Sequence, residues 1–541
     1  MGGFRTLLCC TALMLALMPG LGGPAQAGVM NPIASDPVTI DTGKVAGTQL
    51  DNGVRAYLGI PFAAPPVREL RWKAPQPAKA WNGIYNADTK PSHCYIPLRA
   101  TTLNHYFGER PSSEDCLYLN IWVPPGTRPD AKLPVVIWIH GGGFQEGSIN
   151  FDIYGGQKMA QKGVIYMGIA YRVGIFGNMA HPELSKESGH NASGNWGLMD
   201  QIAGLKWVQR NIAAFGGDPA NVTVLGQSAG ALAVDALASS PLAKGLFAKI
   251  IGLSGAYHGV AAPRIETLAE NEANGVRLQQ AMKADSVAQM RTIPADQIVN
   301  IAAANKIRFS GPTIDGYLLP QTPEQAYAEG KQADVPLLAG TVGNDLGSRN
   351  AVTTAKTVAE YQKAAADMFK SDAAQFLKLF PARTDADVAR QADTVARMTG
   401  FGIAARDWAK AAVATGKAPA WVVQYTRPHP YAPGAVITDM DTATAGAYHN
   451  SDLPFWFGTL DEMNLYDKRR AWTPADYRLS GRMVDVVAAF AKTSNPATAD
   501  APIPRYNPRR EQRLLFNDPI TVETLNPAQV NFISSHTPRR N

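Results

Sequence analysis

The chain has 541 residues, of which 45% are hydrophobic and 18% charged, and its formal net charge is +6. This composition excludes a disordered or fibrous protein and predicts a globular one with a large core. Lysines and arginines are scattered, without the basic runs or interleaved aromatic residues of a nucleic-acid groove, so no nucleic-acid partner is expected.

The first 27 residues have the pattern of a secretory signal peptide. Arg5 precedes an apolar run at 7–18, and the segment ends in small residues before Gly28. The run is shorter than the roughly 20 residues that a membrane span needs. We therefore predict cleavage and an exported protein, periplasmic or secreted, whose mature chain begins at about Gly28 and carries a charge of +5. No later segment resembles a membrane span.

Cys94 and Cys116 are the only cysteines that follow the signal peptide. In an exported protein two cysteines are most simply a disulfide, and two free thiols are the alternative. No metal site is predicted, because neither cysteine has a CxxC partner or a nearby pair of histidines.

Strand-like apolar runs then alternate with helical stretches, which favours an α/β fold with a mostly parallel central sheet flanked by helices. Helices are predicted over 198–211 and 231–238, and both should pack on the sheet. Longer Ala-rich helical stretches at 265–304 and 357–415 predict helical cap segments at approximately 256–310 and 350–415. No linker separates a second unit, so 28–541 is expected to be one domain. The clearest strands are expected at 133–139, 164–170, 222–225, 250–253, 335–339 and 421–425.

Three glycines follow the first of these strands, in His140-Gly141-Gly142-Gly143. Acyl transfer passes through a tetrahedral oxyanion, which needs backbone N–H groups that converge without side chains in the way. A phosphate cradle is disfavoured, because the P-loop lysine and a GxGxxG pattern after a strand are both missing; no cofactor is predicted. The amides of Gly142 and Gly143 are the predicted donors.

The strand at 222–225 leads into Gly226-Gln227-Ser228-Ala229-Gly230, a G-x-S-x-G turn. Such a turn between a strand and a helix exposes a serine hydroxyl at the carboxyl edge of a sheet. It also directs the amide of the next residue, Ala229, toward a developing oxyanion. Ser228 is therefore the predicted nucleophile, and Ala229 the third oxyanion donor.

The base and the acid should follow the serine in the order serine, acid, histidine. His449 lies in a loop after the last predicted strand, where its imidazole can reach the edge of the sheet. Asp345 follows the strand at 335–339 and is the predicted acid, which would hold the imidazole tautomer and stabilise the imidazolium. Asp315 also lies between serine and histidine and ranks second, as a turn residue ahead of that strand.

With these motifs in place, the chain resembles the type-B carboxylesterases of the α/β-hydrolase fold along nearly all of its mature length. That group includes bacterial para-nitrobenzyl esterases, animal carboxylesterases and cholinesterases. The resemblance implies that Cys94 and Cys116 form the family's N-terminal disulfide, and that Ser228, His449 and an acid near Asp345 form a catalytic triad. Further matching stretches are YLGIPFA at 57–63, SEDCLYLN at 113–120, YRVG at 171–174, GNWGL at 194–198 and NIAAFGGDPANV at 211–222.

The chain departs from this family at the acid and at the residue before the nucleophile. Many members have D-E-G at the acid, with glutamate as the triad residue, whereas this chain has Asn344-Asp345-Leu346. Gln227 stands where relatives often have glutamate, which removes a negative charge beside the serine. Ser254 matches a serine often found near the family's catalytic site. We expect Gln227 and Ser254 to lie behind the catalytic residues and to support them without touching the substrate.

The sequence thus predicts a secreted serine carboxylesterase with a Ser-His-Asp triad and an HGGG oxyanion hole, acting on small-molecule esters. One alternative is an esterase for polycarboxylic esters, as in the fumonisin-type esterases of this family; the positive charge, Gln227, Arg308 and Arg349 favour it. An alternative of another class is a non-catalytic interaction protein on the same fold. A lipase is disfavoured, since neither cap segment carries a large apolar lid. The oligomeric state is not predicted.

Overall fold

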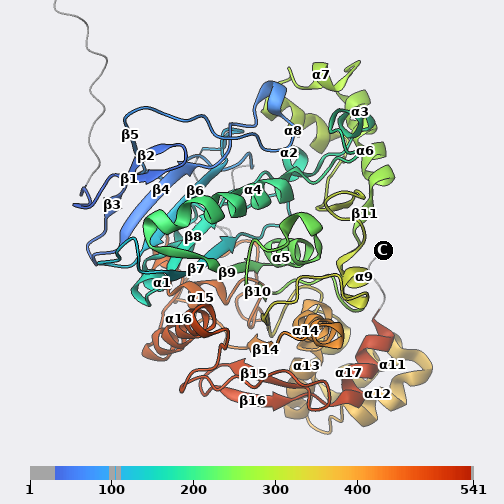
Figure 1. Ribbon diagram of the computed structural model, residues 1–541. Coiled ribbons are helices and arrows are strands. Elements are labelled where there is room, and N and C mark those ends of the chain that lie inside the picture. Colours follow the sequence, from blue (N-terminus) through green and yellow to red (C-terminus); the bar gives the residue numbers. More distant parts are fainter. Residues whose placement is uncertain (1–30, 97–103, 105–110, 538–541) are drawn as a thin grey trace, which may run out of the picture.

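The computed structural model describes residues 31–96, 104 and 111–537, so the predicted signal peptide at 1–27 lies outside the described residues. Within them the chain forms an 11-stranded sheet in the order β16-β15-β14-β13-β10-β9-β7-β8-β6-β4-β3 (Figure 1). Its strands are β3 (Thr48–Gln49), β4 (Arg55–Pro61), β6 (Tyr118–Val123), β7 (Leu133–Ile139), β8 (Ile165–Ile169), β9 (Gly217–Gln227), β10 (Lys249–Leu253), β13 (Leu337–Val342), β14 (Ala420–Tyr425), β15 (Gln512–Phe516) and β16 (Thr521–Thr524).

The middle of this sheet is parallel, from β15 through β14, β13, β10, β9 and β7 to β8, as predicted. Antiparallel strands continue it at both ends, with β16 beside β15 and with β6, β4 and β3 beyond β8. The parallel strands β7, β8 and β13 are buried along nearly their whole length, as expected for a sheet covered on both faces. Each of the six predicted strands overlaps an observed strand in the sequence.

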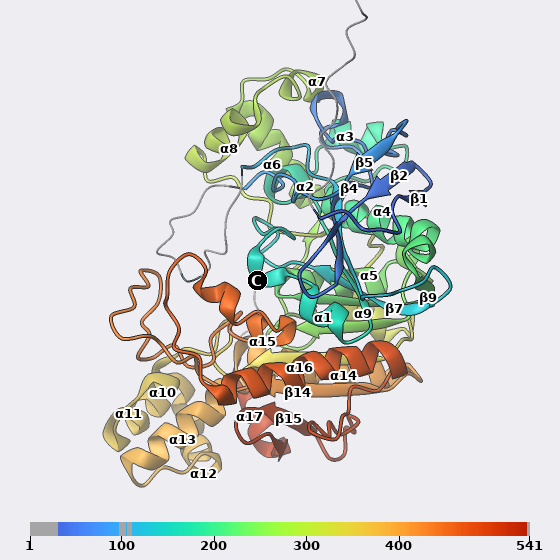
Figure 2. The ribbon, with the colours of Figure 1, turned by 90° about the vertical axis from the view of Figure 1, so that its left-hand side faces the viewer.

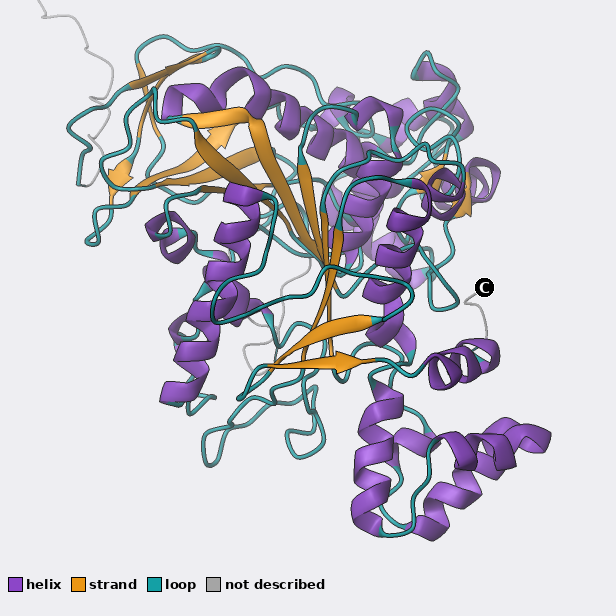
Figure 3. Cartoon of the chain, turned by 60° about the horizontal axis from the view of Figure 1, so that its bottom comes forward, coloured by secondary structure: helices purple, strands orange, loops and turns teal. Residues whose placement is uncertain are grey.

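Helices cover both faces of the sheet (Figures 1 and 3). The helices α4 (Trp196–Asn211), α5 (Ala229–Ser239) and α14 (Ala404–Thr415) pack on one face, and α16 (Pro474–Thr493) packs on the other. Gly204 lets α4 approach the sheet, because a Cβ there would lie 2.6 Å from a methyl carbon of Ile169. The helices predicted over 198–211 and 231–238 are present as α4 and α5. None of the described helices is long and apolar enough to cross a membrane.

The segment 256–310 forms α6 (Leu268–Ala281), α7 (Val287–Met290) and α8 (Ala295–Ala304), which enclose a small apolar cluster together with Trp72 and Phe176. In Figure 1 these helices lie at the upper right. The remaining short helices of the main body are α1 (Gln157–Gln161), α2 (Gly174–Asn178), α3 (Pro182–Glu187), α9 (Pro323–Ala328) and α15 (Leu453–Phe457).

The segment 350–415 divides into two parts. Its first part builds a separate hydrophobic cluster with the C-terminal helix, whereas its last helix, α14, packs on β13 and β14 within the main core. Trp408 of α14 fills the space that Gly252 of β10 leaves open. The helical period is the same in both parts, so the sequence pattern alone could not separate them. The first part and the C-terminal helix are α10 (Ala351–Thr354), α11 (Val358–Phe369), α12 (Ala373–Leu379), α13 (Asp385–Ala396) and α17 (Pro527–His536), called here the α10–α13 unit.

The N-terminal region adds a small sheet of β1 (Val38–Ile40), β2 (Gly43–Ala46) and β5 (Ile84–Asn86), which the sequence reading did not anticipate.

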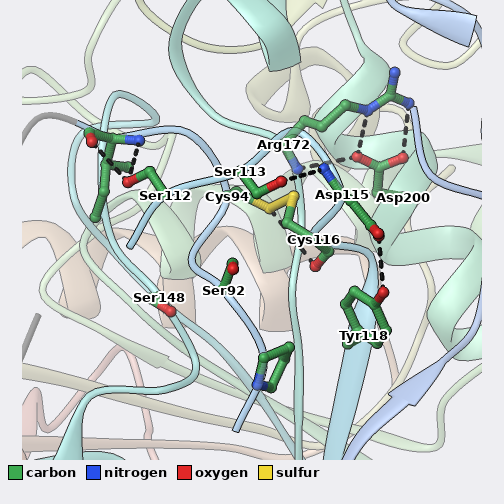
Figure 4. The surroundings of a disulfide bond; sticks show 12 residues. Ser92, Cys94, Ser112, Ser113, Asp115, Cys116, Tyr118, Ser148, Arg172 and Asp200 are labelled. Carbon is green, nitrogen blue, oxygen red and sulfur yellow. Dashed lines mark hydrogen bonds and ion pairs between the residues drawn. A yellow bond between two sulfur atoms is a disulfide. The ribbon is translucent and has the colours of Figure 1, made fainter. Parts of the chain in front are cut away.

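The predicted disulfide is present: Cys94 and Cys116 are bonded, with their Cα atoms 4.9 Å apart. Figure 4 shows it beside the ion pair of Arg172 and Asp200, whose side chains are both buried and 2.7 Å apart. A two-stranded pairing of β11 (Glu266–Thr267) with β12 (Thr313–Ile314) completes the fold.

Candidate active site

Ser228 occupies a sharp turn between β9 and α5, with φ of 55° and ψ of −124°. This backbone conformation is rare for a residue with a side chain, and such strain is typical of functional sites. The amide of Ser228 donates to the carbonyl of Leu253 on the neighbouring strand at 2.8 Å, which fixes the turn at the carboxyl edge of the sheet.

The two glycines of the G-x-S-x-G turn are required by close backbone contacts. A Cβ on Gly226 would overlap the carbonyl of Gly230, and a Cβ on Gly230 would overlap the carbonyl of Ile139 at the end of β7. The turn therefore packs directly against the strand that leads into the HGGG loop. This contact brings two motifs that are far apart in the sequence to the same edge of the sheet.

A chain of hydrogen bonds joins the serine to a buried carboxylate. Ser228 Oγ lies 2.9 Å from Nε2 of His449, and Nδ1 of His449 lies 2.6 Å from Oδ1 of Asp345. The Asp345 side chain is completely buried, and it accepts the amide of Leu346 at 2.8 Å. With the imidazole proton on Nδ1 and donated to Asp345, Nε2 can accept the proton of Ser228.

Asn344 holds the loops of the acid and the histidine together, a role that sequence reasoning missed. Its amide donates to the carbonyl of Ala447 at 2.8 Å, and its Oδ1 accepts the amide of Ala447 at 3.0 Å. Gly446 lacks a Cβ that would overlap this side chain. The only signal in the sequence was the Asn-Asp pair after β13, where the family resemblance directed attention to the aspartate alone.

Asp315, the second-ranked acid, is not beside the histidine. Its Oδ2 accepts a hydrogen bond from Asn195 at 2.8 Å, and its Oδ1 accepts the amides of Tyr317 and Leu319. Burial raises its pKa above the usual value, and these hydrogen bonds oppose that effect. Asp315 therefore stabilises a turn, and Asp345 is the carboxylate that reaches His449.

The HGGG loop after β7 has a glycine-dependent backbone. Gly142 has φ of 110° and Gly143 has φ of 61°, and a Cβ on Gly142 would overlap the carbonyl of Glu146. His140 anchors the start of the loop: its ring stacks on Tyr171 at 4.2 Å, and burial lowers its pKa to about 4. The neutral ring of His140 can therefore stay packed here at physiological pH.

Gln227 and Ser254, the two residues expected to support the catalytic groups, differ in their contacts. Gln227 is buried, and its Nε2 lies 3.3 Å from Nε2 of His449 and hydrogen-bonds to Asn450. Ser254 is also buried, and its amide donates to the carbonyl of Gly340, but its Oγ has no hydrogen-bond partner within the described part of the chain. Gln227 therefore contacts the imidazole directly, whereas Ser254 contributes to the site through its backbone.

Asp452 is a further buried carboxylate close to this site. One of its oxygens accepts the indole N–H of Trp456 at 2.9 Å, and the other has no partner among the described residues. Burial raises its pKa to about 6, and the charge of Asp345 adds to the increase.

A cavity of about 210 Å³ opens over Ser228. We call it the serine cavity. Gly143 and Ala229 line it beside Ser228, so the amides of two predicted oxyanion donors lie near the hydroxyl, whereas Gly142 is not among its lining residues. Its other walls are Phe144, Leu232, Tyr257, Pro263, Arg264, Glu266, Ser310, Gly311, Pro312, Leu346 and Phe401.

Comparison with known proteins gives consistent matches. The model of the carboxylesterase family matches residues 34–533. The fumonisin B1 esterase of Sphingopyxis macrogoltabida is 36% identical over 483 residues, covering 87% of this chain and 84% of that protein. The para-nitrobenzyl esterase of Bacillus subtilis is 34% identical over 501 residues, covering 90% and 96%. A solved para-nitrobenzyl esterase structure superposes with a TM-score of 0.74 at 32% identity, covering 92% and 99%.

Proposed function

Because this chain belongs to the carboxylesterase family and is a carboxylic ester hydrolase of the α/β-hydrolase fold, we propose that it acts through a serine nucleophile, with Ser228, His449 and Asp345 as its triad. The observation that carries the proposal is the continuous hydrogen-bonded chain from Ser228 Oγ through both nitrogens of His449 to Asp345. No other carboxylate among the described residues is hydrogen-bonded to His449.

In the first step Nε2 of His449 takes the proton of Ser228 as Oγ attacks the ester carbonyl carbon. The carbonyl oxygen becomes negative, and the amides of Gly142, Gly143 and Ala229 are the proposed donors to it. When the tetrahedral species collapses, the bond from carbon to the alcohol oxygen breaks, and this oxygen takes the proton from Nε2. Water then repeats the sequence, releases the acid and restores the free Ser228 hydroxyl.

Asp345 replaces the glutamate that many relatives carry, and the shorter side chain still reaches His449. Asn344 explains how: its two hydrogen bonds to Ala447 draw the histidine loop against the acid loop. The buried carboxylate then compensates the positive charge that appears on the imidazole during each proton transfer.

We also propose that the protein is exported, with residues 1–27 as a cleaved signal peptide. The disulfide of Cys94 and Cys116 supports this, because disulfides form and persist mainly in oxidising compartments. Mass determination of the mature protein from culture would test it; a chain that retained residues 1–27 would contradict it.

The catalytic proposal is tested by the variant Ser228→Ala. We expect it to lose hydrolysis of para-nitrophenyl acetate by roughly 10⁶-fold, because the reaction loses its nucleophile, and to lose labelling by a serine-directed organophosphate. The variant Ser239→Ala, at the other end of α5, is the matched control and should still be labelled. A fully active Ser228→Ala protein would overturn the proposal, and a wild-type protein that resists labelling would favour the interaction-protein alternative.

A further inference from the structure

A second cavity, of about 650 Å³, is lined by His449 but not by Ser228, and we call it the histidine cavity. Its walls come from the loop after β13, from α10 and α13, and from the loop before His449. Figure 2 shows the latter loop, in orange, above the helices α10 and α13. Leu346 lines both cavities, and its side chain is 46% exposed, so it forms a ridge between them.

The histidine cavity contains two cationic side chains, Arg349 and Lys356, both exposed to solvent. Neither has a carboxylate within ion-pair distance in the described part of the chain. Arg349 donates to Thr444 Oγ1 at 3.3 Å, which holds the guanidinium at the wall. The hydroxyl of Thr444 in turn donates to Asp441, and this bond is the largest cause of the lowered pKa of Asp441.

The carboxylates that line this cavity are already engaged. Asp345 is bonded to His449, and Asp393 pairs with Arg397 at 3.0 Å. Asp439 accepts the backbone amide of Asn104 at 2.8 Å. Arg349 and Lys356 are thus cations without an ion-pair partner among the described residues, and they can pair with an anionic ligand.

The described lining of the serine cavity contains no cation without a carboxylate partner. Its charged residues are Arg264 and Glu266, one of each sign, and Arg264 is paired with Glu270. An anionic group bound there would face Glu266 without an unpaired cation to compensate. The two cavities therefore differ in whether a lining cation is left without a carboxylate partner among the described residues.

The proposed chemistry assigns one part of the ester to each cavity. The acyl part stays bonded to Ser228 Oγ after the first step, next to the oxyanion donors that line the serine cavity. The alcohol oxygen must take its proton from Nε2 of His449, so the alcohol part leaves Ser228 on the side of the histidine. Of the two cavities, the histidine cavity is the one that His449 lines.

We propose that this enzyme prefers esters whose alcohol part carries a carboxylate, that is, esters of hydroxycarboxylic acids, with Arg349 and Lys356 as the specificity-determining residues. This inference rests on the proposed serine mechanism and names the substrate class for it. It differs from the prediction of polycarboxylic esters, in which the acid part carries the additional carboxylates.

Matched esters test the preference. The butanoyl ester of γ-hydroxybutanoate is compared with that of γ-hydroxybutanamide, and monobutyl succinate with butyl succinamate, by measuring proton release. Within each pair only the charge changes, on the alcohol part in the first pair and on the acid part in the second. We expect kcat/KM to favour the charged member of the first pair by about tenfold, and higher salt to reduce this preference.

The variant R349Q/K356Q should bring the preference in the first pair close to one. The variant K378Q/R383Q removes the same charge from the α10–α13 unit at exposed positions that line neither cavity, and it should retain the preference. A wild-type enzyme without the preference, a preference confined to the second pair, or a preference that survives in R349Q/K356Q would overturn the inference. If Ser228→Ala were active on these esters, the mechanism itself would fail instead.

Discussion

The main sheet and the α10–α13 unit differ in what they contribute to the site and in how they are packed. The sheet holds Ser228, Asp345 and the HGGG loop at the carboxyl ends of buried strands. At Gly142, Gly226 and Gly230 the neighbouring backbone is so close that an added Cβ would overlap it. The α10–α13 unit has its own small core and contributes one wall of the histidine cavity. The proposed catalytic residues thus lie on the main sheet, and one wall of the histidine cavity is built on a unit whose core is separate.

The largest expected effect lies on the sheet side and separates the two aspartates. Asp345→Asn should lower kcat by roughly 10⁴-fold, because an amide favours the wrong imidazole tautomer and cannot stabilise the imidazolium. Asp315→Asn should instead lower the free energy of unfolding by about 1–3 kcal/mol, because buried backbone amides lose a charged acceptor, and it should leave kcat within a few-fold. Steady-state kinetics and urea unfolding of both variants measure this; the reverse pattern would make Asp315 the acid.

A core substitution tests whether the α10–α13 unit unfolds separately. Phe376 is fully buried among Phe369, Phe380 and Phe532 of this unit. Phe376→Ala should destabilise the unit by about 3–5 kcal/mol, and hydrogen exchange should accelerate in α11–α13 and α17 before it does in β9 and β10.

The matched substitution in the main core is Phe490→Ala, at a fully buried position on α16. Because α16 packs against β7 and β9, this variant should accelerate exchange in the sheet and impair hydrolysis. Equal acceleration in the sheet for both variants would show that the protein unfolds as one unit, and the contrast between the two regions would then disappear.

The oxyanion loop provides the next test. Gly142→Ala should lower kcat by about 10²–10³-fold, because the added Cβ must displace the Glu146 carbonyl or move the loop, so its amides lose their position. Gly245→Ala has a similar positive φ of 80° and meets no atom within 4 Å, so it measures the backbone cost alone. Kinetics with para-nitrophenyl acetate compare the two, and a Gly142→Ala enzyme as active as Gly245→Ala would argue against a role for this loop.

The sequence predicted the sheet region well because its constraints are local. Gly226 is required by a contact within its own turn, and the strand at 133–139 matches β7 residue for residue. It predicted the cap segments only as helical, because the apolar period of α14 resembles that of α11 although one covers the sheet and the other does not. The role of Asn344 depends on a contact with Ala447, more than 100 positions away, and no local pattern records it.

The smallest effect concerns pH and the buried carboxylate of Asp452. Its pKa is raised to about 6 in the folded protein from an ordinary value of 3.8, mainly by burial. The folded state therefore binds this proton more tightly than the unfolded state does, and the free energy of unfolding decreases as pH rises from about 4 through 6, by at most about 3 kcal/mol. Asp452→Asn cannot ionise and should lack this component.

Thermal unfolding of the wild type and of Asp452→Asn, followed from pH 4 to pH 7, measures the difference. We expect the wild type to lose stability relative to the variant over this interval, because only the wild type acquires a buried charge with one unpartnered oxygen. Parallel stability curves would show that ionisation of Asp452 does not contribute to the pH dependence of unfolding. Asp452 lies three residues after His449. A measured difference would therefore also show that the site keeps a group that lowers the stability of the folded protein. This is expected where a functional site needs a fixed electrostatic environment at the expense of stability.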